Sequence, residues 1–320
     1  MSRFSYLSNK IKQADFENVP FKHIYIEDFF SNEDFELIQK CPEVSLPEVK
    51  NDNELIQSLF ENGYKVINFP GCISNPDAYI KWHTHKEKSN RIHSACEGFG
   101  LVVRLFKKKS KILEELDHFL LSDEFNSSIA KKFNIPIKDC KVDGGIQKYL
   151  DGYEISPHPD VRKKAATYMV NINPTELSEA SDHHTHYLKL KNEKKYISDF
   201  WSHNPEYDRD WVPWEWCDTV KQQTKNNSIV IFSPSNDTMH AVKASYDHLK
   251  TQRTQLYGNI WYSHSETKPL KWEQLQIPLK NNFVRKGIVG QIKTMFSPKA
   301  KSLLKTLFRR SNDVGKTNMN

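Results

Sequence analysis

The chain has 320 residues and a mass of 37.5 kDa, enough for one large domain with additions or for two small ones. Hydrophobic residues make up 38% of the chain, charged residues make up 27%, and the mean hydropathy is -0.70, which excludes an integral membrane protein. No apolar run approaches the roughly 18 to 20 residues that span a bilayer. The first residues lack an apolar block with a cleavage site, so we expect a cytoplasmic protein.

Cysteine usage and charge divide the chain further. The five cysteines are far apart and form no C-x-x-C pair, so we expect reduced thiols rather than a disulfide framework or a zinc knuckle. The formal net charge is +6, but residues 284–320 hold nine basic side chains and one acidic side chain. We therefore predict a nearly neutral domain over residues 1–283 and a basic tail over residues 284–320.

The first half of the chain predicts a mixture of helices and strands. A strand over 21–28 leads to a helix capped by Ser31, and a helix around 55–60 follows. Strands are expected over 64–69 and 99–106, with a loop-rich region between them. Two more helices are expected, one capped by Ser110 and one over 124–133.

Short strands dominate the second half. We expect strands over 146–150, 166–172, 187–191, 228–232, 239–243 and 255–262. Strands this short, separated by Gly, Pro and Asn, predict a sandwich or jelly roll, so the fold class is α+β with a mainly β core. A long connection over 192–227 carries four tryptophans and is expected either as a lid or as a cover for the outer face of the sheet. Apolar residues at helical spacing predict amphipathic helices in the basic tail.

One short motif carries metal-binding chemistry. In His158-Pro159-Asp160 an imidazole and a carboxylate lie two residues apart, and on a strand such residues point to the same side. A third ligand is offered by His240, which follows the apolar strand over 228–232. Two imidazoles and one carboxylate on one side of a metal are the ligand set of non-haem Fe(II) oxygenases. Arg253 opens the next strand, and a buried guanidinium there would need an anion such as a dicarboxylic acid.

With these residues in this order, the chain resembles the Fe(II)- and 2-oxoglutarate-dependent dioxygenases, most closely their prolyl-4-hydroxylase-like branch. The resemblance covers about residues 140–265 and includes Tyr149, nine residues before the first ligand histidine. It implies a double-stranded β-helix, or jelly roll, with iron bound to His158, Asp160 and His240. It also implies that Arg253 pairs with the distal carboxylate of 2-oxoglutarate and that Tyr149 lines the cosubstrate pocket.

Two departures from the family pattern concern the pocket. Asn171 stands where a pocket tyrosine is common, and Asn173-Pro174-Thr175 replaces a Gly-Gly-Glu-Thr-like turn. The resemblance implies a hydroxylase that uses Fe(II), 2-oxoglutarate and O2, with ascorbate as a candidate reductant, and releases succinate and CO2. Its substrate is not identified by the sequence. Related halogenases lack the carboxylate ligand, so Asp160 favours hydroxylation or desaturation over halogenation.

An alternative function comes from a different class. A non-catalytic jelly-roll binding module would keep the fold and use the basic tail for contact with a membrane or a partner. The tail has no basic pattern interleaved with aromatic residues, so we expect no specific nucleic-acid binding. Packing of the tail on the domain or on a second copy is the remaining interpretation. The sequence does not predict the oligomeric state.

Two further groups of histidines invite a metal assignment. His183 and His184 are adjacent, so they cannot both face one ion from a strand, and we expect residues 182–186 on a solvated loop rim. His83 and His85 have suitable spacing but no third ligand can be assigned from the sequence, so a surface loop is expected.

Overall fold

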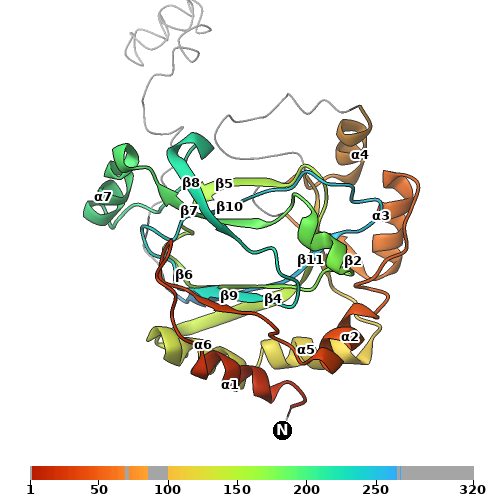
Figure 1. Ribbon diagram of the computed structural model, residues 1–320, viewed down its shortest axis with the longest axis horizontal. Coiled ribbons are helices and arrows are strands. Elements are labelled where there is room, and N and C mark those ends of the chain that lie inside the picture. Colours follow the sequence, from red (N-terminus) through yellow and green to blue (C-terminus); the bar gives the residue numbers. More distant parts are fainter. Residues whose placement is uncertain (1, 69–71, 86–99, 265–266, 268–320) are drawn as a thin grey trace, which may run out of the picture. The chain divides into compact units, whose positions relative to one another are not determined.

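Antiparallel strands form two sheets in the computed structural model, which describes residues 2–68, 72–85, 100–264 and 267 (Figure 1). The strands are β1 Ile24–Ile26, β2 Tyr64–Val66, β3 Val102–Leu105, β4 Cys140–Tyr149, β5 Glu154–His158, β6 Lys164–Asn171, β7 Thr185–Leu190, β8 Cys217–Gln222, β9 Ile229–Phe232, β10 His240–Lys243 and β11 Arg253–Tyr262. The α-helices are α1 Ser5–Gln13, α2 Asn32–Gln39, α3 Asp52–Glu61, α4 Pro76–His85, α5 Lys111–Leu120, α6 Asp123–Phe133 and α7 Tyr196–His203. Short 3-10 helices are η1 Ile137–Asp139, η2 Glu176–Ala180, η3 Asn192–Lys194 and η4 Trp214–Trp216.

The chain passes back and forth between the two sheets. The larger sheet has the order β1-β9-β6-β11-β4-β3-β2, and the smaller has the order β5-β10-β7-β8. Consecutive strands such as β4 and β5, or β9 and β10, therefore belong to different sheets. Figure 1 shows the smaller sheet above the larger one, with α1, α2, α5 and α6 below the larger sheet. This arrangement agrees with the predicted jelly-roll-like β core and N-terminal helices.

Alternate side chains of strand β11 lie on opposite faces of the larger sheet. Leu256 and Ile260 join the apolar cluster that includes the buried stripes of α1, α5 and α6. Tyr257 lies on the opposite face and packs with Met169 of β6 and Tyr187 of β7, between the sheets. Alternation along a strand then places Arg253 on the same inner face as Tyr257. Polar side chains of β11 such as Arg253 therefore lie on the inner face, between the two sheets.

Helix boundaries show which local signals were reliable. The cap predicted at Ser31 is confirmed, because its hydroxyl accepts the Asp34 N–H at 3.2 Å. Helix α5 does begin after Ser110, but that hydroxyl donates to Glu43 instead of capping the helix. The loop-rich region predicted between the strands over 64–69 and 99–106 was wrong at residues 76–85, which form helix α4. Its start had a readable signal, since Asn75 Oδ1 accepts the Ala78 N–H at 2.9 Å and Pro76 occupies the first turn.

The connection over 192–227 contains α7 and β8, neither of which the sequence indicated. Trp201 of α7 is fully buried. Trp214 donates its indole N–H to Glu154 of β5 at 3.0 Å, and its ring lies edge-on to His186 of β7 at 5.4 Å. These contacts favour the expected cover over the sheet rather than a free lid. The boundary at residue 283 and the predicted tail helices lie outside the described residues, within which no helix is long and apolar enough to cross a membrane.

Candidate metal centre

The three predicted metal ligands meet at the end of the smaller sheet. His158 ends β5 and His240 begins β10, and the two are directly opposite each other in the antiparallel pair. His158 Nε2 lies 3.6 Å from Asp160 Oδ1, and His240 Nε2 lies 3.9 Å from Asp160 Oδ2. One ligand atom from each residue lies within 4.8 Å of the others. The structure thus brings the predicted set together.

The reason given for pairing His158 with Asp160 was nevertheless wrong. Strand β5 stops at His158, and Asp160 has a φ of 64°, in the left-handed region that a strand residue does not occupy. A turn, rather than strand alternation, brings the carboxylate back toward the imidazole. The Thr238 hydroxyl donates to the carbonyl of Pro159 at 3.0 Å and so ties this turn to the start of β10.

The tautomers of both imidazoles suit metal binding. His158 Nδ1 lies 2.8 Å from the Ser156 carbonyl, and His240 Nδ1 lies 2.9 Å from the Thr238 carbonyl. A carbonyl oxygen can only accept, so each Nδ1 carries a proton, and the neutral form of each ring keeps its lone pair on Nε2. Burial lowers the pKa of His240 to about 3, so this ring is neutral at physiological pH. The Nε2 lone pair of His240 is therefore available to a cation beside Asp160.

The carboxylate of Asp160 is held from two sides. Lys164 donates to Oδ1 at 2.6 Å and Thr167 donates to Oδ2 at 2.8 Å. Burial alone would raise the pKa of Asp160, but the Lys164 charge together with His240 and His158 outweighs it and keeps that pKa well below its usual range. Each oxygen retains a second lone pair for a cation. Lys164 and Thr167 are orienting residues that the sequence analysis missed.

Arg253 supplies a buried cation without a carboxylate partner among the described residues. Its side chain is 2% exposed, its Cζ lies 4.4 Å from the centre of the Tyr149 ring, and Nη2 donates to Thr185 at 3.0 Å. Nη1 has no hydrogen-bond partner within the part of the chain that the structure describes. Burial lowers the pKa of Arg253 from its ordinary value. A desolvated guanidinium with a free N–H fits a carboxylate ligand.

His183 is a second buried polar group without a hydrogen-bond partner among the described residues. It is fully buried, its ring lies 4.6 Å from that of Tyr246, and neither ring nitrogen has a hydrogen bond to a described residue. Burial and the charge of Arg253 lower the pKa of His183 to about 2, so the ring is neutral. His184 is also buried and contacts the Glu179 carbonyl at 3.1 Å. The solvated rim predicted for these two histidines was wrong, because other segments cover the loop.

The remaining predicted pocket residues have partners within the protein. Asn171 donates to the carbonyls of Gln223 and Lys225 and accepts from Gln255, so its amide ties β6 to the connection and to β11. Its predicted role in cosubstrate binding remains untested. Tyr149 places its ring against Arg253 while its hydroxyl lies 2.5 Å from the Gln147 amide, and its role in lining the pocket likewise stays a prediction.

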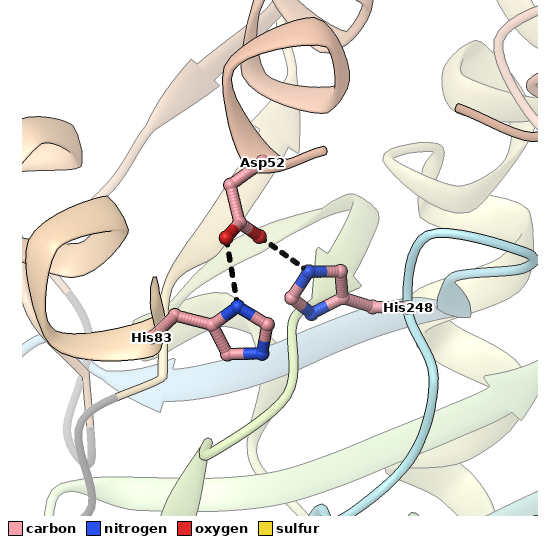
Figure 2. Close-up of side chains that lie close together, drawn as sticks. All are labelled: Asp52, His83 and His248. Atoms are coloured by element: carbon pink, nitrogen blue, oxygen red, sulfur yellow. Dashed lines mark hydrogen bonds and ion pairs between the residues drawn. The ribbon is translucent and has the colours of Figure 1, made fainter. Parts of the chain in front are cut away.

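A second cluster of possible metal ligands lies between α3, α4 and the segment before β11. Figure 2 shows Asp52 between His83 and His248, at 2.8 Å from His83 Nδ1 and 2.7 Å from His248 Nε2. Asp151 lies on the far side of His83, 3.1 Å from Nε2. The surface loop predicted for His83 was wrong, since this residue is on α4 and largely enclosed.

The hydrogen bonds of this cluster argue against a metal. His248 Nδ1 accepts the Asp151 N–H at 2.9 Å, so its Nε2 carries a proton that is donated to Asp52. Both nitrogens of His83 face carboxylates, which favours the doubly protonated ring. Burial would lower the pKa of His83, but Asp151 and Asp52 outweigh it and raise the pKa to about 9. With both relevant lone pairs protonated, we interpret the cluster as an ionic lock that joins four chain segments.

The ionic lock predicts a specific pH dependence of stability. The pKa of His83 rises from 6.5 to about 9 on folding, so its stabilisation is complete below pH 6.5 and is lost as the pH rises through 9. His83→Gln should lower the free energy of unfolding by about 1–3 kcal/mol at pH 6 and by clearly less at pH 9.5. Urea unfolding at both pH values measures this, with the exposed His203→Gln as control. A penalty that does not change with pH would contradict the lock.

Comparisons with known proteins give a fold likeness and no sequence match. No family model and no curated protein matches the chain. Among solved structures, the chain is similar to a Pseudomonas putida prolyl-4-hydroxylase, with 7% identity, a TM-score of 0.40, and coverage of 81% of this chain and 98% of that one. It is also similar to a Trichoplax adhaerens prolyl hydroxylase in complex with a hypoxia inducible factor peptide, with 11% identity, a TM-score of 0.37, and coverage of 81% and 90%.

A third similar structure is HygX from Streptomyces hygroscopicus, solved with nickel, 2-oxoglutarate and hygromycin B. Its identity is 10%, its TM-score is 0.30, and the match covers 68% of this chain and 90% of that one. These three similar structures are two prolyl hydroxylases and a protein that binds nickel and 2-oxoglutarate, all at low identity and low TM-score. The case for a function depends on the side chains themselves.

Proposed function

We propose that this chain is an Fe(II)- and 2-oxoglutarate-dependent dioxygenase that hydroxylates a substrate and releases succinate and CO2. The observation that carries the proposal is the convergence of His158, Asp160 and His240, whose ligand atoms lie within 4.8 Å of one another while both imidazole Nδ1 atoms donate to backbone carbonyls. Two imidazoles and one carboxylate form the ligand set of non-haem iron oxygenases and leave positions open for cosubstrates.

The residues around the triad fit both iron and 2-oxoglutarate. His158, Asp160 and His240 would hold the ferrous ion, and the buried, unpaired Nη1 of Arg253 would bind the distal carboxylate of 2-oxoglutarate. When bound, iron with 2-oxoglutarate and O2 supplies the chemistry that places one oxygen atom in a substrate C–H bond and the other in succinate.

The chain's own groups prepare this chemistry in three ways. Lys164 and Thr167 fix the Asp160 carboxylate, so the third ligand is oriented before a metal arrives. Thr185 accepts from Arg253 and, with the Tyr149 ring, fixes the guanidinium plane. Burial of Arg253 and His240 excludes water, which strengthens the attraction between the guanidinium and a carboxylate. Retention of a carboxylate ligand at Asp160 supports hydroxylation over halogenation.

Succinate formation tests this proposal. Purified protein incubated aerobically with Fe(II) and 2-oxoglutarate should release succinate, and Asp160→Ala should stop that release. Asp160→Ala is a suitable inactive control because it removes one metal ligand and leaves Arg253 in place. Equal succinate release by the two proteins would contradict the proposed function.

A further inference from the structure

The segment between α7 and η4 lies against the turn that carries Asp160. The Val212 N–H donates to the Pro157 carbonyl at 2.8 Å, and the Arg162 side chain donates from Nε to the Tyr207 carbonyl at 2.7 Å. Asp208 accepts the backbone N–H of Arg162 at 2.7 Å. Residues 207–212 are thus fixed beside residues 157–162, and Arg209 lies in the middle of this contact.

Arg209 is a buried cation without a neutralising partner among the described residues. The residue is 7% exposed, its Nε has no hydrogen-bond partner, and no ion pair connects it to a carboxylate in the described part of the chain. Two acids flank Arg209 in the sequence: Asp208 accepts the backbone N–H groups of Arg162 and Arg209 at Oδ1, and Asp210 accepts the backbone N–H of Trp211 at Oδ1. Burial and the Arg162 charge lower the pKa of Arg209 to about 10, so the guanidinium remains charged at neutral pH.

An unpaired buried guanidinium costs stability, so its retention calls for a ligand. The Asp160 charge acts on Arg209, which is consistent with its position beside the triad. The charges of Asp160, Asp208 and Asp237 all raise the pKa of Arg209, but none of these carboxylates forms an ion pair with it in the described part of the chain. Arg253 is separately placed against Tyr149 and Thr185. Two buried arginines therefore lie in two different settings, Arg209 beside residues 157–162 and Arg253 against Tyr149 and Thr185, which suits two different anions.

We propose that Arg209 binds an oxyanion of the substrate, either a carboxylate or a phosphate ester, and so positions the substrate beside the triad. This inference rests on the proposed function and names the substrate class. A planar guanidinium binds both kinds of oxyanion through paired N–H groups. The cosubstrate carboxylate is assigned to Arg253, so the anion at Arg209 belongs to the second molecule in the site.

Anion binding by the full chain, loaded with Ni(II) and 2-oxoglutarate, tests the proposal. Inorganic phosphate and acetate are titrated separately at constant ionic strength, and the unfolding temperature is followed. The wild type should show a saturable rise with at least one anion, and binding should be at least about tenfold weaker in Arg209→Met. A stronger response to phosphate indicates a phosphate ester, and a stronger response to acetate indicates a carboxylate. Arg3→Gln, which removes an arginine that pairs with Asp34 away from the triad, should keep this response.

Two further readouts separate binding from a structural role. Without added anions, Arg209→Met should unfold at the same temperature as the wild type or higher, because the substitution removes an uncompensated buried charge. Its affinity for 2-oxoglutarate should match that of the wild type. A clear loss of unfolding temperature, an equal anion response in both proteins, or no response in either would overturn the inference.

The failure of this inference can be told apart from that of the proposed function. Loss of 2-oxoglutarate affinity in Arg209→Met, with metal binding intact, would assign Arg209 to the cosubstrate and overturn the inference while leaving the oxygenase proposal standing. Failure of the wild type itself to bind 2-oxoglutarate would instead contradict the proposed function.

Discussion

His240→Ala should lose Co(II) binding by at least about 100-fold, because it removes one of three ligands from a site whose other members are already fixed. Co(II) replaces Fe(II) as a stable probe, and its visible absorption reports the imidazole and carboxylate ligands directly. The wild type should bind one Co(II) per chain. His240 is neutral and its Nε2 lone pair is free, so no conformational change is needed for binding.

The ionic lock supplies the matched control for this experiment. His83→Gln removes a histidine from the other Asp/His cluster, where hydrogen bonds occupy the nitrogens, and should leave Co(II) binding unchanged. Two bound Co(II) ions per wild-type chain would contradict the absence of metal binding argued for the ionic lock. Loss of binding in His83→Gln and not in His240→Ala would show that the metal has been assigned to the wrong cluster.

Arg253→Gln should weaken 2-oxoglutarate binding while leaving the metal site intact. A hydrogen bond to a charged group contributes about 1.5–3 kcal/mol, so the dissociation constant should rise about 10–100-fold. Arg253→Lys should recover part of the affinity, because it restores the charge without the paired N–H geometry. Calorimetric titration of 2-oxoglutarate into Ni(II)-loaded protein measures both variants.

A distant arginine separates this effect from a general loss of positive charge. Arg3 pairs with Asp34 of α2 on the helical side of the larger sheet, so Arg3→Gln should bind 2-oxoglutarate as the wild type does. Unchanged affinity in Arg253→Gln would exclude Arg253 as the carboxylate anchor. Loss of Co(II) binding in the same variant would mean that the substitution disturbs the triad rather than the cosubstrate.

The residues that converge at the triad could be predicted from the sequence because local patterns carry them. His158 and Asp160 lie in one short motif, and His240 and Arg253 each lie where an apolar run predicts a strand end. Ligand chemistry then restricted the choice to a set that one cation could join. The buried guanidinium expected at Arg253 is found on the inner face of β11, against the Tyr149 ring.

The ionic lock could not be predicted because its members have no local relation. Asp52 is 31 residues from His83 and 196 residues from His248, and only the packing of α3, α4 and the segment before β11 brings them together. The solvated loop predicted around His183 was wrong for a similar reason. A polar sequence indicates a solvated loop, yet the ring of Tyr246, far along the chain, covers this one. Burial of a loop depends on tertiary contacts that period and propensity do not record.

Anaerobic titration of Fe(II) and then 2-oxoglutarate into the wild type, followed by visible absorption, tests the central claim most directly. Chelation of the keto acid by ferrous iron should produce a weak visible charge-transfer band that saturates at one equivalent, and His240→Ala should lack it. A folded wild-type protein that gives no band would contradict the oxygenase proposal and favour a non-catalytic jelly-roll binding module.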